Sequence, residues 1–482
     1  MNTYLGSKGY TLSKSELSVT EQEKIRSNLT VKPKVPGAPI TTNISFFAYR
    51  ESPNKMYVPH YYGVTHFGLP CELRISDGDN INLEFVGSLR EAQINVVNAY
   101  IKHVSVLNYG GGLLELNCGG GKTVCGLNII SLLKKKTLII VHKEFLMNQW
   151  IERITQFLPS AKIGKIQGQV IDIQDKDIVI GMLQSLSMKT YPQEVFESFG
   201  LTIIDEVHHI SSEVFSNTLF KLVTKFMVGL SATMNRKDGT TNIFKMFLGD
   251  VVYKGERDEK HDVVVRAIDY YVNDDEFNSI VYDYRGNTQF STMISKLCAY
   301  TNRSEFIIKI IKDLFLENSS QQIMVLAHNK SILCYLYEAI KDRNIESVGY
   351  YVGGMKEAEL KKTETKKIVI ATYSMASEAL DIKTLTTLIM ATPKTDIEQS
   401  VGRILREKHS RPIVIDIIDS HTIFQNQWKK RKTFYVKEKY KIIRSSNTLY
   451  YNTVNGNAFE NTSIWKNINE VKPKKKMGFG CL

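Results

Sequence analysis

Residues 115 to 123 read Glu-Leu-Asn-Cys-Gly-Gly-Gly-Lys-Thr, between an apolar-leaning stretch and a pattern typical of a helix. Glycines 119 to 121 allow backbone N–H groups to turn toward an anion, and the N-terminus of the next helix adds its positive end. In such a phosphate-binding loop, which would include Cys118, Lys122 reaches the β- and γ-phosphates of ATP and Thr123 holds Mg²⁺. A glycine-rich turn before a helix also occurs as plain loop structure, so this segment alone leaves both interpretations open.

A second motif places two carboxylates at the end of an apolar run. Residues 201 to 208 read Leu-Thr-Ile-Ile-Asp-Glu-Val-His, which predicts a buried strand with Asp205 and Glu206 at its C-terminal edge, where ligands bind in open α/β sheets. We expect Asp205 to hold Mg²⁺ through water and Glu206 to orient the attacking water. A solvated strand end is the alternative for this tetrad alone. His208 and His209 are adjacent and do not suit one metal ion, so we expect His208 to form a hydrogen bond between lobes.

From about Leu89 onward, helical and strand patterns alternate in two successive series. Strands that alternate with helices imply right-handed crossovers and a parallel sheet, so the sequence predicts an α/β fold with two parallel-sheet lobes in tandem. The first series has helices at 91–103, 122–133 and 143–157 and strands at 137–141, 178–181 and 201–204. The second has a helix at 304–314 and strands at 323–327, 368–371, 388–391 and 413–417.

The two ends of the chain have a different composition. The first 40 or so residues are polar and end in a proline-rich stretch, which predicts an extended connector. Short alternating runs at 44–49, 57–62 and 81–85 predict a small β-rich module. We therefore expect an N-terminal module at 1–84 that contacts nucleic acid or a partner, an ATP-binding lobe at 85–258, a second lobe at 259–444 and a polar, basic tail at 445–482.

Length and composition restrict the class of protein. The 482 residues exceed the size of one core, so at least two domains are expected. The six cysteines show no metal-binding spacing, which favours a reducing compartment and no structural metal. The sequence shows no signal segment, no lipidation motif and no run of about 18 apolar residues. We therefore expect a soluble, intracellular, non-secreted protein with no membrane partner.

The chain is basic, with 62 lysines and arginines against 50 acidic residues and a net charge of +12. An excess of cations favours a polyanionic partner through counterion release, and nucleic acid is the leading candidate. A basic surface that serves only solubility is the alternative. The lysine run at 474–476 fits a solvated tail better than a specific site.

Taken together, the glycine-rich loop and the Asp-Glu-Val-His tetrad resemble superfamily-2 helicases of the DEAH type, and the resemblance continues in chain order from Leu89 to Arg406. It implies two RecA-like lobes that use ATP and Mg²⁺. It assigns Arg90, Gln93 and residues 118 to 123 to the nucleotide, with Gln93 reading adenine. It assigns His142, Gln184, Ser185, Arg236 and Thr372 to nucleic-acid contact. It assigns Ser231, Thr233 and Asp381 to the coupling of ATP state with strand movement.

The segment Gln399-Ser-Val-Gly-Arg403-Ile-Leu-Arg406 resembles the arginine motif of the family's second lobe. Charge that develops on the γ-phosphate needs fixed cations, and arginine supplies a planar fork that is always charged. Arg403 and Arg406 lie three residues apart, so one helix would present both on one face. An ordinary surface charge pair is the alternative. We predict an arginine finger, with Gln399 and His208 also part of the catalytic set.

Within that superfamily, residues 229 to 239, Arg303 and the pattern from Gln427 to Tyr435 resemble the branch of excision-repair and recombination helicases, which act on double-stranded DNA. Residues 57 to 63 resemble the members found in large DNA viruses, including poxviruses, where transcription termination is the implied role. Three positions depart from the family pattern. Met234 replaces a proline, Ala379 replaces a glycine in a loop where alanine resists positive φ, and Leu116 replaces the first glycine of the phosphate loop.

The segment from Trp428 to Lys441 mixes cations with aromatic residues. Such a mixture suits phosphate contacts and the stacking of unpaired bases. A helix that buries Trp428, Phe434 and Tyr435 in the second lobe, with its lysines in water, is an equal alternative.

The functional hypothesis is a two-lobed motor that hydrolyses ATP and moves along single-stranded or duplex DNA. By resemblance, it would act with RNA polymerase or its accessory factors and release nascent RNA from a transcription complex, in the virion and the host-cell cytoplasm. A repair or recombination translocase is an alternative. A nucleic-acid scaffold that keeps ATP as a structural ligand is another, and the full set of Lys122, Glu206 and Arg406 disfavours it.

Overall fold

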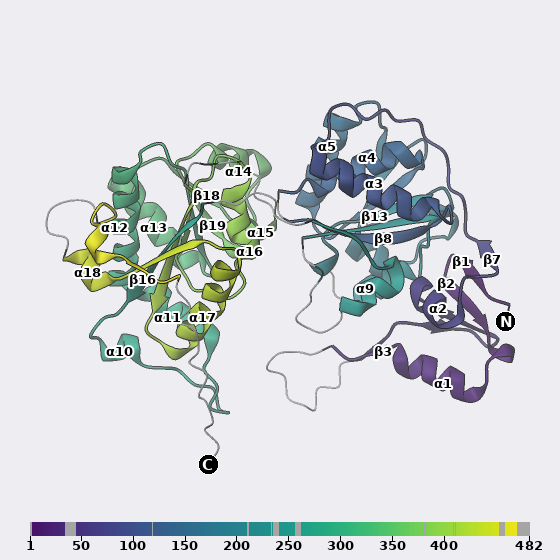
Figure 1. Ribbon diagram of the computed structural model, residues 1–482, viewed down its shortest axis with the longest axis horizontal. Helices are drawn as coiled ribbons and strands as arrows, with labels where there is room; N and C mark the ends of the chain where they lie inside the picture. The colour runs from purple at the N-terminus through teal and green to yellow at the C-terminus, as the bar shows by residue number, and fades with distance from the viewer. Residues whose placement is uncertain are drawn as a thin grey trace, which may run out of the picture. The chain divides into compact units, whose positions relative to one another are not determined.

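The computed structural model of the chain is shown in Figure 1. It describes residues 2–33, 45–117, 119–209, 212–232, 234, 241–255, 262–378, 382–407, 409, 411–452 and 458–469. The chain divides into two compact units, Met1–Arg257 and Asp258–Leu482.

The first unit is built on an eight-stranded sheet with the strand order β11-β10-β12-β9-β13-β14-β8-β15. Neighbouring strands are parallel, except that β10 and β11 are antiparallel. The strands are β8 (Gly110–Glu115), β9 (Thr137–Val141), β10 (Ile163–Gln167), β11 (Val170–Asp172), β12 (Ile178–Met182), β13 (Leu201–Ile204), β14 (Phe226–Ser231) and β15 (Val251–Lys254).

Both faces of this sheet are covered, as the continuous apolar runs of its central strands predict. In β9, Ile139 belongs to the core on one face and Ile140 to the core on the other. The first face packs against α3 (Glu91–Ser105), α4 (Lys122–Leu133) and α5 (Glu144–Phe157) (Figure 1). The second packs against α6 (Leu183–Met188), α8 (Ser212–Leu219) and α9 (Thr241–Leu248), while α7 (Glu194–Glu197) and the 3₁₀ turn η2 (Val207–His209) lie in connections.

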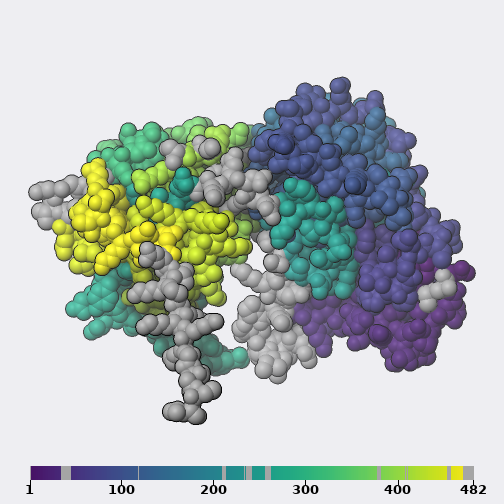
Figure 2. Space-filling model, in the orientation of Figure 1, coloured from purple at the N-terminus to yellow at the C-terminus, as the bar shows by residue number. Residues whose placement is uncertain are grey.

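The N-terminal residues form a small sheet with the order β5-β6-β2-β1-β7. Its hydrophobic residues and those of α8 and α9 belong to one core, so the small sheet is packed onto the second face of the eight-stranded sheet. Figure 2 shows the N-terminal residues, in purple, against the teal α9 region. The elements are β1 (Tyr4–Gly6), β2 (Gly9–Ser13), η1 (Lys14–Glu16), α1 (Val19–Asn28), β3 (Thr30–Val31), β4 (Phe46–Phe47), β5 (Arg50–Glu51), β6 (Lys55–Val58), α2 (His60–Phe67) and β7 (Glu72–Arg74).

The prediction of an extended N-terminal connector is wrong for residues 2–33, which fold into strands and a helix. Tyr10 and Leu12 of β2 are fully buried, and a capping box between Ser18 and Glu21 starts α1. The β-rich character of the module is confirmed, but two predicted runs differ. The run at 57–62 leaves the sheet after Val58, because Pro59 lacks an N–H group and precedes α2. Residues 81–85 form no strand. Residues 34–44, with most of the proline-rich stretch, lie outside the described residues.

The second unit contains an eight-stranded sheet with the order β18-β19-β17-β20-β21-β16-β22-β23, parallel except between β22 and β23. With the first unit it confirms the predicted α/β fold of two RecA-like lobes. The strands are β16 (Val264–Tyr270), β17 (Ile323–Ala327), β18 (Val348–Tyr351), β19 (Ile368–Thr372), β20 (Thr387–Met390), β21 (Ile413–Asp419), β22 (Lys441–Ser446) and β23 (Lys466–Asn467). The helices are α10 (Asp275–Asn278), α11 (Phe290–Ala299), α12 (Thr301–Glu317), α13 (Lys330–Asp342), α14 (Glu357–Glu364), α15 (Tyr373–Glu378), α16 (Glu398–Gly402), α17 (Thr422–Lys437) and α18 (Asn447–Tyr451), with 3₁₀ turns η3 (Arg403–Leu405) and η4 (Thr462–Ile464).

The predicted tail begins too early. Residues 441–446 form a strand of the main sheet, and Tyr450 and Phe459 are buried in the core of the second unit. The polar composition of this stretch hid these few apolar anchors. Residues 470–482, including the lysine run, lie outside the described part of the chain.

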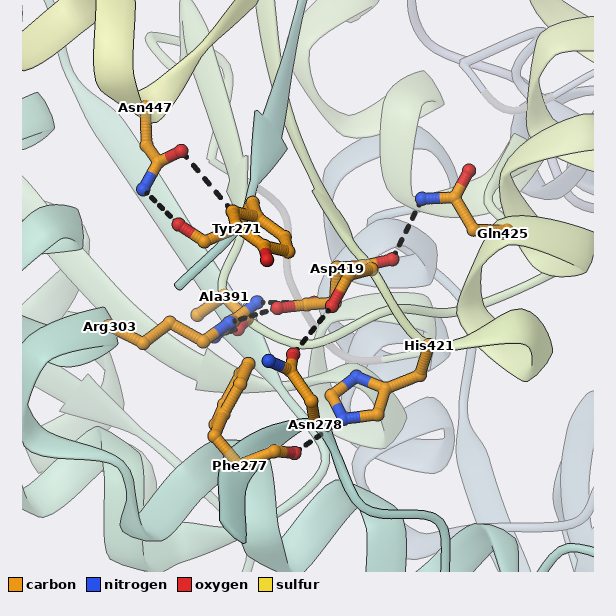
Figure 3. Close-up of polar contacts among 10 residues, drawn as sticks. Tyr271, Phe277, Asn278, Arg303, Ala391, Asp419, His421, Gln425 and Asn447 are labelled. Carbon is orange, nitrogen blue, oxygen red and sulfur yellow. Dashed lines mark hydrogen bonds and ion pairs between the residues drawn. The ribbon is translucent and has the colours of Figure 1, made fainter. Parts of the chain in front are cut away.

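Two buried ion pairs hold the second unit together. Arg303 of α12 forms a bidentate pair with Asp419 of β21, with N–O distances of 2.6 and 2.9 Å, and donates a third hydrogen bond to the carbonyl of Ala391 at 2.6 Å (Figure 3). Arg431 of α17 pairs with Asp416 at 2.8 Å through two nitrogens. Both arginines are almost fully buried, so these residues of the branch pattern tie helices to the sheet.

The helix α17 buries aromatic residues in the core of the second unit, which is the second of the two alternatives predicted for this segment. Trp428 is 4% exposed and Tyr435 is fully buried, and the Tyr435 hydroxyl donates to Asp416 at 2.9 Å. Lys429 and Lys430 are exposed. The buried aromatic rings are therefore not available to stack on bases.

None of the described helices is both long enough and apolar enough to cross a bilayer.

Replacement of Arg303 by alanine is expected to destabilise the second unit by about 3–5 kcal/mol, because it leaves Asp419 charged and unpaired inside the core. Arg343→Ala is the matched control, because its pair with Glu305 is partly exposed and worth about 0–1 kcal/mol. Urea unfolding followed by tryptophan fluorescence measures both. Equal urea midpoints for the two variants would contradict the conclusion that the buried pair of Arg303 with Asp419 stabilises the second unit.

Candidate nucleotide-binding site

The phosphate loop connects the end of β8 with the start of α4. Gly119 has φ 82° and Gly121 has φ 80°, in the left-handed region that glycine tolerates best. The Gly120 N–H donates to the Asn117 carbonyl at 2.9 Å, which closes a tight turn. The loop therefore leads directly into the N-terminus of α4, where Lys122 and Thr123 are the first two residues. Cys118 lies outside the described residues.

The start of α3 holds this loop in place. The Arg90 guanidinium donates to the Gly119 carbonyl at 2.9 Å, and the Gln93 amide donates to the Gly120 carbonyl at 3.4 Å. Gln93 also accepts from the Arg90 N–H at 2.9 Å, and only 5% of Gln93 is exposed. These two residues therefore position the phosphate loop. The adenine contact of Gln93 stays a prediction.

The acidic motif reaches the same loop from β13. The Lys122 ammonium pairs with Glu206 Oε1 at 2.5 Å, across 84 residues of sequence. Glu206 has φ 49°, a left-handed conformation that is unfavourable for a residue with a side chain. Such strain is maintained only where the surroundings fix it, and it aims this carboxylate at the phosphate loop.

Asp205 is held in a different way. Its carboxylate is 5% exposed and accepts hydrogen bonds from the Trp150 indole N–H at 2.9 Å and from the Glu206 N–H at 3.0 Å. Burial, followed by the charge of Glu206, raises the pKa of Asp205 to about 6. Trp150, on α5, is a site residue that the sequence analysis missed, because nothing local marks a contact across 55 residues.

His208 connects the acidic motif to β14. Its Nδ1 lies 2.7 Å from Ser231 Oγ and 3.3 Å from Glu206 Oε2. Ser231 is fully buried at the end of β14. The hydrogen bond that the structure gives for His208 lies within the first unit, and the expected bond between lobes stays a prediction. Thr233 lies outside the described residues.

The residues predicted to contact nucleic acid fall into two groups in the first unit. The Gln184 amide donates to the His142 carbonyl at 3.0 Å, which joins the end of β9 to α6. The Ser185 hydroxyl instead accepts from the Gly168 N–H at 2.8 Å. In the second unit, Thr372 ends β19, and its hydroxyl lies 3.2 Å from that of Ser374. Arg236, Ala379 and Asp381 lie outside the described residues.

The arginine motif differs from the single helix that was predicted. The α-helix α16 ends at Gly402, and Arg403 begins the 3₁₀ turn η3. Residues three apart are eclipsed in such a turn, so Arg403 and Arg406 remain on one side. Burial raises the pKa of Tyr351 at the end of β18, and the charges of Arg403 and Arg406 oppose that rise. Arg403 is 7% exposed, and Gln399 is half-buried on α16.

Comparison with known proteins agrees with this geometry. The family described as "Type III restriction enzyme, res subunit" matches residues 87–236. The chain is 36% identical to "Putative ATP-dependent RNA helicase L396" of Acanthamoeba polyphaga mimivirus over 447 residues, 90% of this chain and 85% of that protein. The chain therefore belongs to the superfamily-2 helicases and is an ATP-hydrolysing enzyme of that family.

Two other relatives are more distant. The chain is 28% identical to "Putative ATP-dependent RNA helicase QP509L" of African swine fever virus, over 70% of each chain. It is 25% identical to "DNA 3'-5' translocase XPB2" of Sulfurisphaera tokodaii, over 71% of this chain and 84% of that protein. The names of these relatives thus include both RNA and DNA as the nucleic acid.

Replacement of Gly121 by alanine is expected to reduce ATP affinity about tenfold or more, since the backbone strain alone costs about 1–3 kcal/mol. The added Cβ would also overlap with Gln93 Nε2. Gly286→Ala is the control, because Gly286 has φ 78° and nothing within 4 Å of its added Cβ. Titration with a fluorescent ATP analogue measures both. Equal affinities would show that the loop does not bind the nucleotide.

Proposed function

We propose that the protein is an ATP-driven translocase that moves along DNA and unwinds it or displaces what is bound to it. The observation that carries this proposal is the cluster of Lys122, Glu206 and Asp205 at the phosphate loop, in a chain of the helicase family. A loop, an ammonium and two carboxylates at one sheet edge are the groups that phosphoryl transfer requires.

ATP binding would change the partner of Lys122. The ammonium that pairs with Glu206 would turn to the β- and γ-phosphates, whose N–H ligands come from the glycine loop and the start of α4. Glu206, still held near His208, would then orient the water that attacks the γ-phosphate. The exchange requires no movement of the strands, because both side chains project from the same edge.

The residues also fit a magnesium ion. Thr123 follows the phosphate lysine, and Asp205 is a buried carboxylate whose pKa is raised by burial and by Glu206, so a divalent cation would offset the cost of its charge. Thr123 and Asp205 would hold the ion, Asp205 through water. When bound, Mg²⁺ would neutralise part of the negative charge of the phosphates.

In the second unit, Arg403 and Arg406 are assigned to the charge that develops on the γ-phosphate, with Gln399 beside them. Their spacing of three residues, with Arg403 in η3 and Arg406 directly after it, supports this role. Hydrolysis would release the γ-phosphate, and the coupling residues Ser231, Thr233 and Asp381 would transmit the change. The strand contacts would shift through His142, Gln184, Ser185, Arg236 and Thr372.

For the biological role, we propose release of nascent RNA from a stalled viral elongation complex. The similarity to a mimivirus helicase over 90% of this chain supports a viral setting, in the infected-cell cytoplasm and the virion. A repair or recombination translocase is the second candidate, and the translocase relative favours it. ATP-dependent release of RNA from a stalled complex, with RNA polymerase present, distinguishes the two.

Lys122→Ala and Glu206→Gln are each expected to lower DNA-stimulated ATP hydrolysis by at least about 10³-fold, because one removes the phosphate cation and the other the water-orienting carboxylate. Glu206→Gln should still bind ATP. Lys102→Ala, an exposed lysine on α3, is the control and should retain full turnover. A coupled assay with single-stranded DNA, duplex DNA and RNA also identifies the track. Undiminished turnover in either site variant would defeat the motor hypothesis.

A further inference from the structure

A cationic pocket lies at the seam between the N-terminal sheet and the ATP-binding lobe. It encloses about 490 Å³. One side comes from the N-terminal sheet, through Lys8 in the turn between β1 and β2 and Arg50 of β5. The other comes from the lobe, through Lys221, which follows α8. These three residues are hereafter called the seam cations.

The seam cations face a single carboxylate in this pocket, and that carboxylate is already paired. Glu51 forms ion pairs with Lys14 at 2.7 Å and Arg26 at 2.9 Å, and the bonds from Arg26 and then Lys14 lower its pKa to about 2. Lys221 donates to three backbone carbonyls, those of residues 186, 187 and 189, at 2.6–3.0 Å. These carbonyls at the C-terminal end of α6 satisfy all three N–H groups of the ammonium, so Lys221 adds positive charge to the pocket but no free hydrogen-bond donor.

The positive charges at the pocket also affect one another. Burial and then the charge of Arg50 lower the pKa of Lys221, and burial lowers the pKa of Arg50. Arg50 is fixed by hydrogen bonds to the carbonyls of Phe47 and Tyr49 and to the Asn217 side chain. The pocket therefore holds like charges close together in a rigid frame, an arrangement that a bound anion would relieve.

The aromatic residues of the pocket decide between phosphate and base as the ligand. The Lys8 ammonium lies 5.5 Å from the centroid of the Tyr57 ring, and the Arg50 guanidinium lies 5.2 Å from that of Phe220. A cation lies over one face of each ring and Phe220 is only 6% exposed, so little ring surface is left on which a base could stack. The group that fits is a phosphate.

The pocket adjoins the residues assigned to the nucleic-acid track. Ser187 of α6 lines the pocket, and Gln184 and Ser185 precede it on the same helix. Gln184 and Ser187 are separated by about 4.5 Å along the helix axis, so the pocket lies within one helical turn of a predicted track residue. Lys221 binds the C-terminal carbonyls of α6, so it joins the pocket to that helix.

We propose that the seam cations bind the phosphodiester backbone of the nucleic acid, so that the N-terminal sheet is part of the track. This inference rests on the proposed function and adds a contact to which the N-terminal sheet contributes. A phosphate could also come from a free anion, and the experiment distinguishes these sources.

The test compares Lys8→Ala and Lys8→Glu with the control Lys24→Ala, an exposed lysine of α1 on the same N-terminal module. Lys8 lies in an exposed turn, so its substitution should leave the fold intact. Fluorescence anisotropy with labelled single-stranded and duplex DNA is measured from roughly 50 to 200 mM salt. Lys8→Ala should weaken binding about threefold to tenfold at the lower salt, equally for all sequences, and should reduce the slope of log K against log salt by about 1. Lys8→Glu should weaken it further.

The possible outcomes separate the two hypotheses. If the wild type binds no DNA, the proposed function fails. If the wild type binds DNA but the Lys8 variants match Lys24→Ala, only the seam site is overturned. In a second experiment, calorimetry measures the binding of inorganic phosphate to the wild-type protein and to Lys8→Ala. Loss of phosphate binding in Lys8→Ala with an unchanged salt slope for DNA would assign the pocket to a free anion and overturn the backbone contact.

Discussion

The ion pair between Lys122 and Glu206 is the interaction on which the rest of the site depends. It joins the helix after the phosphate loop to a residue just after β13, two elements whose apolar side chains also share one core. Because the same ammonium serves the carboxylate and, in our proposal, the phosphate, ATP binding and water activation are linked through one side chain. The bond of His208 to Ser231 extends this link to β14, the strand that leads to the coupling motif.

The first unit also shows how an accessory module becomes part of a motor lobe. The N-terminal sheet shares its core with α8 and α9, so it cannot be regarded as a separate appendage. Tyr10 and Phe247 are both nearly fully buried in that core. In the second unit, Arg303 and Arg431 serve a comparable structural purpose, because each pairs in the interior with an aspartate of β21.

The sequence predicted best those features that are local. The phosphate loop, the strand before Asp205 and the alternation of helices with strands depend on neighbouring residues, and each was found at or near its predicted bounds. The features that were missed depend on contacts between distant residues. Trp150 meets Asp205 only in the folded sheet, and β1 pairs with β7 across more than sixty residues. Polar segments with few apolar anchors, such as that around Tyr450, were mistaken for a tail.

The central claim is that Lys122 exchanges Glu206 for phosphate, and equilibrium binding of ATP tests it most directly. Replacement of Glu206 by glutamine removes the charge that competes for the ammonium. The account therefore predicts that ATP binds to Glu206→Gln several-fold more tightly than to the wild-type protein, and that this gain disappears when Lys122 is also replaced by alanine. Weaker or equal binding to Glu206→Gln would contradict the exchange.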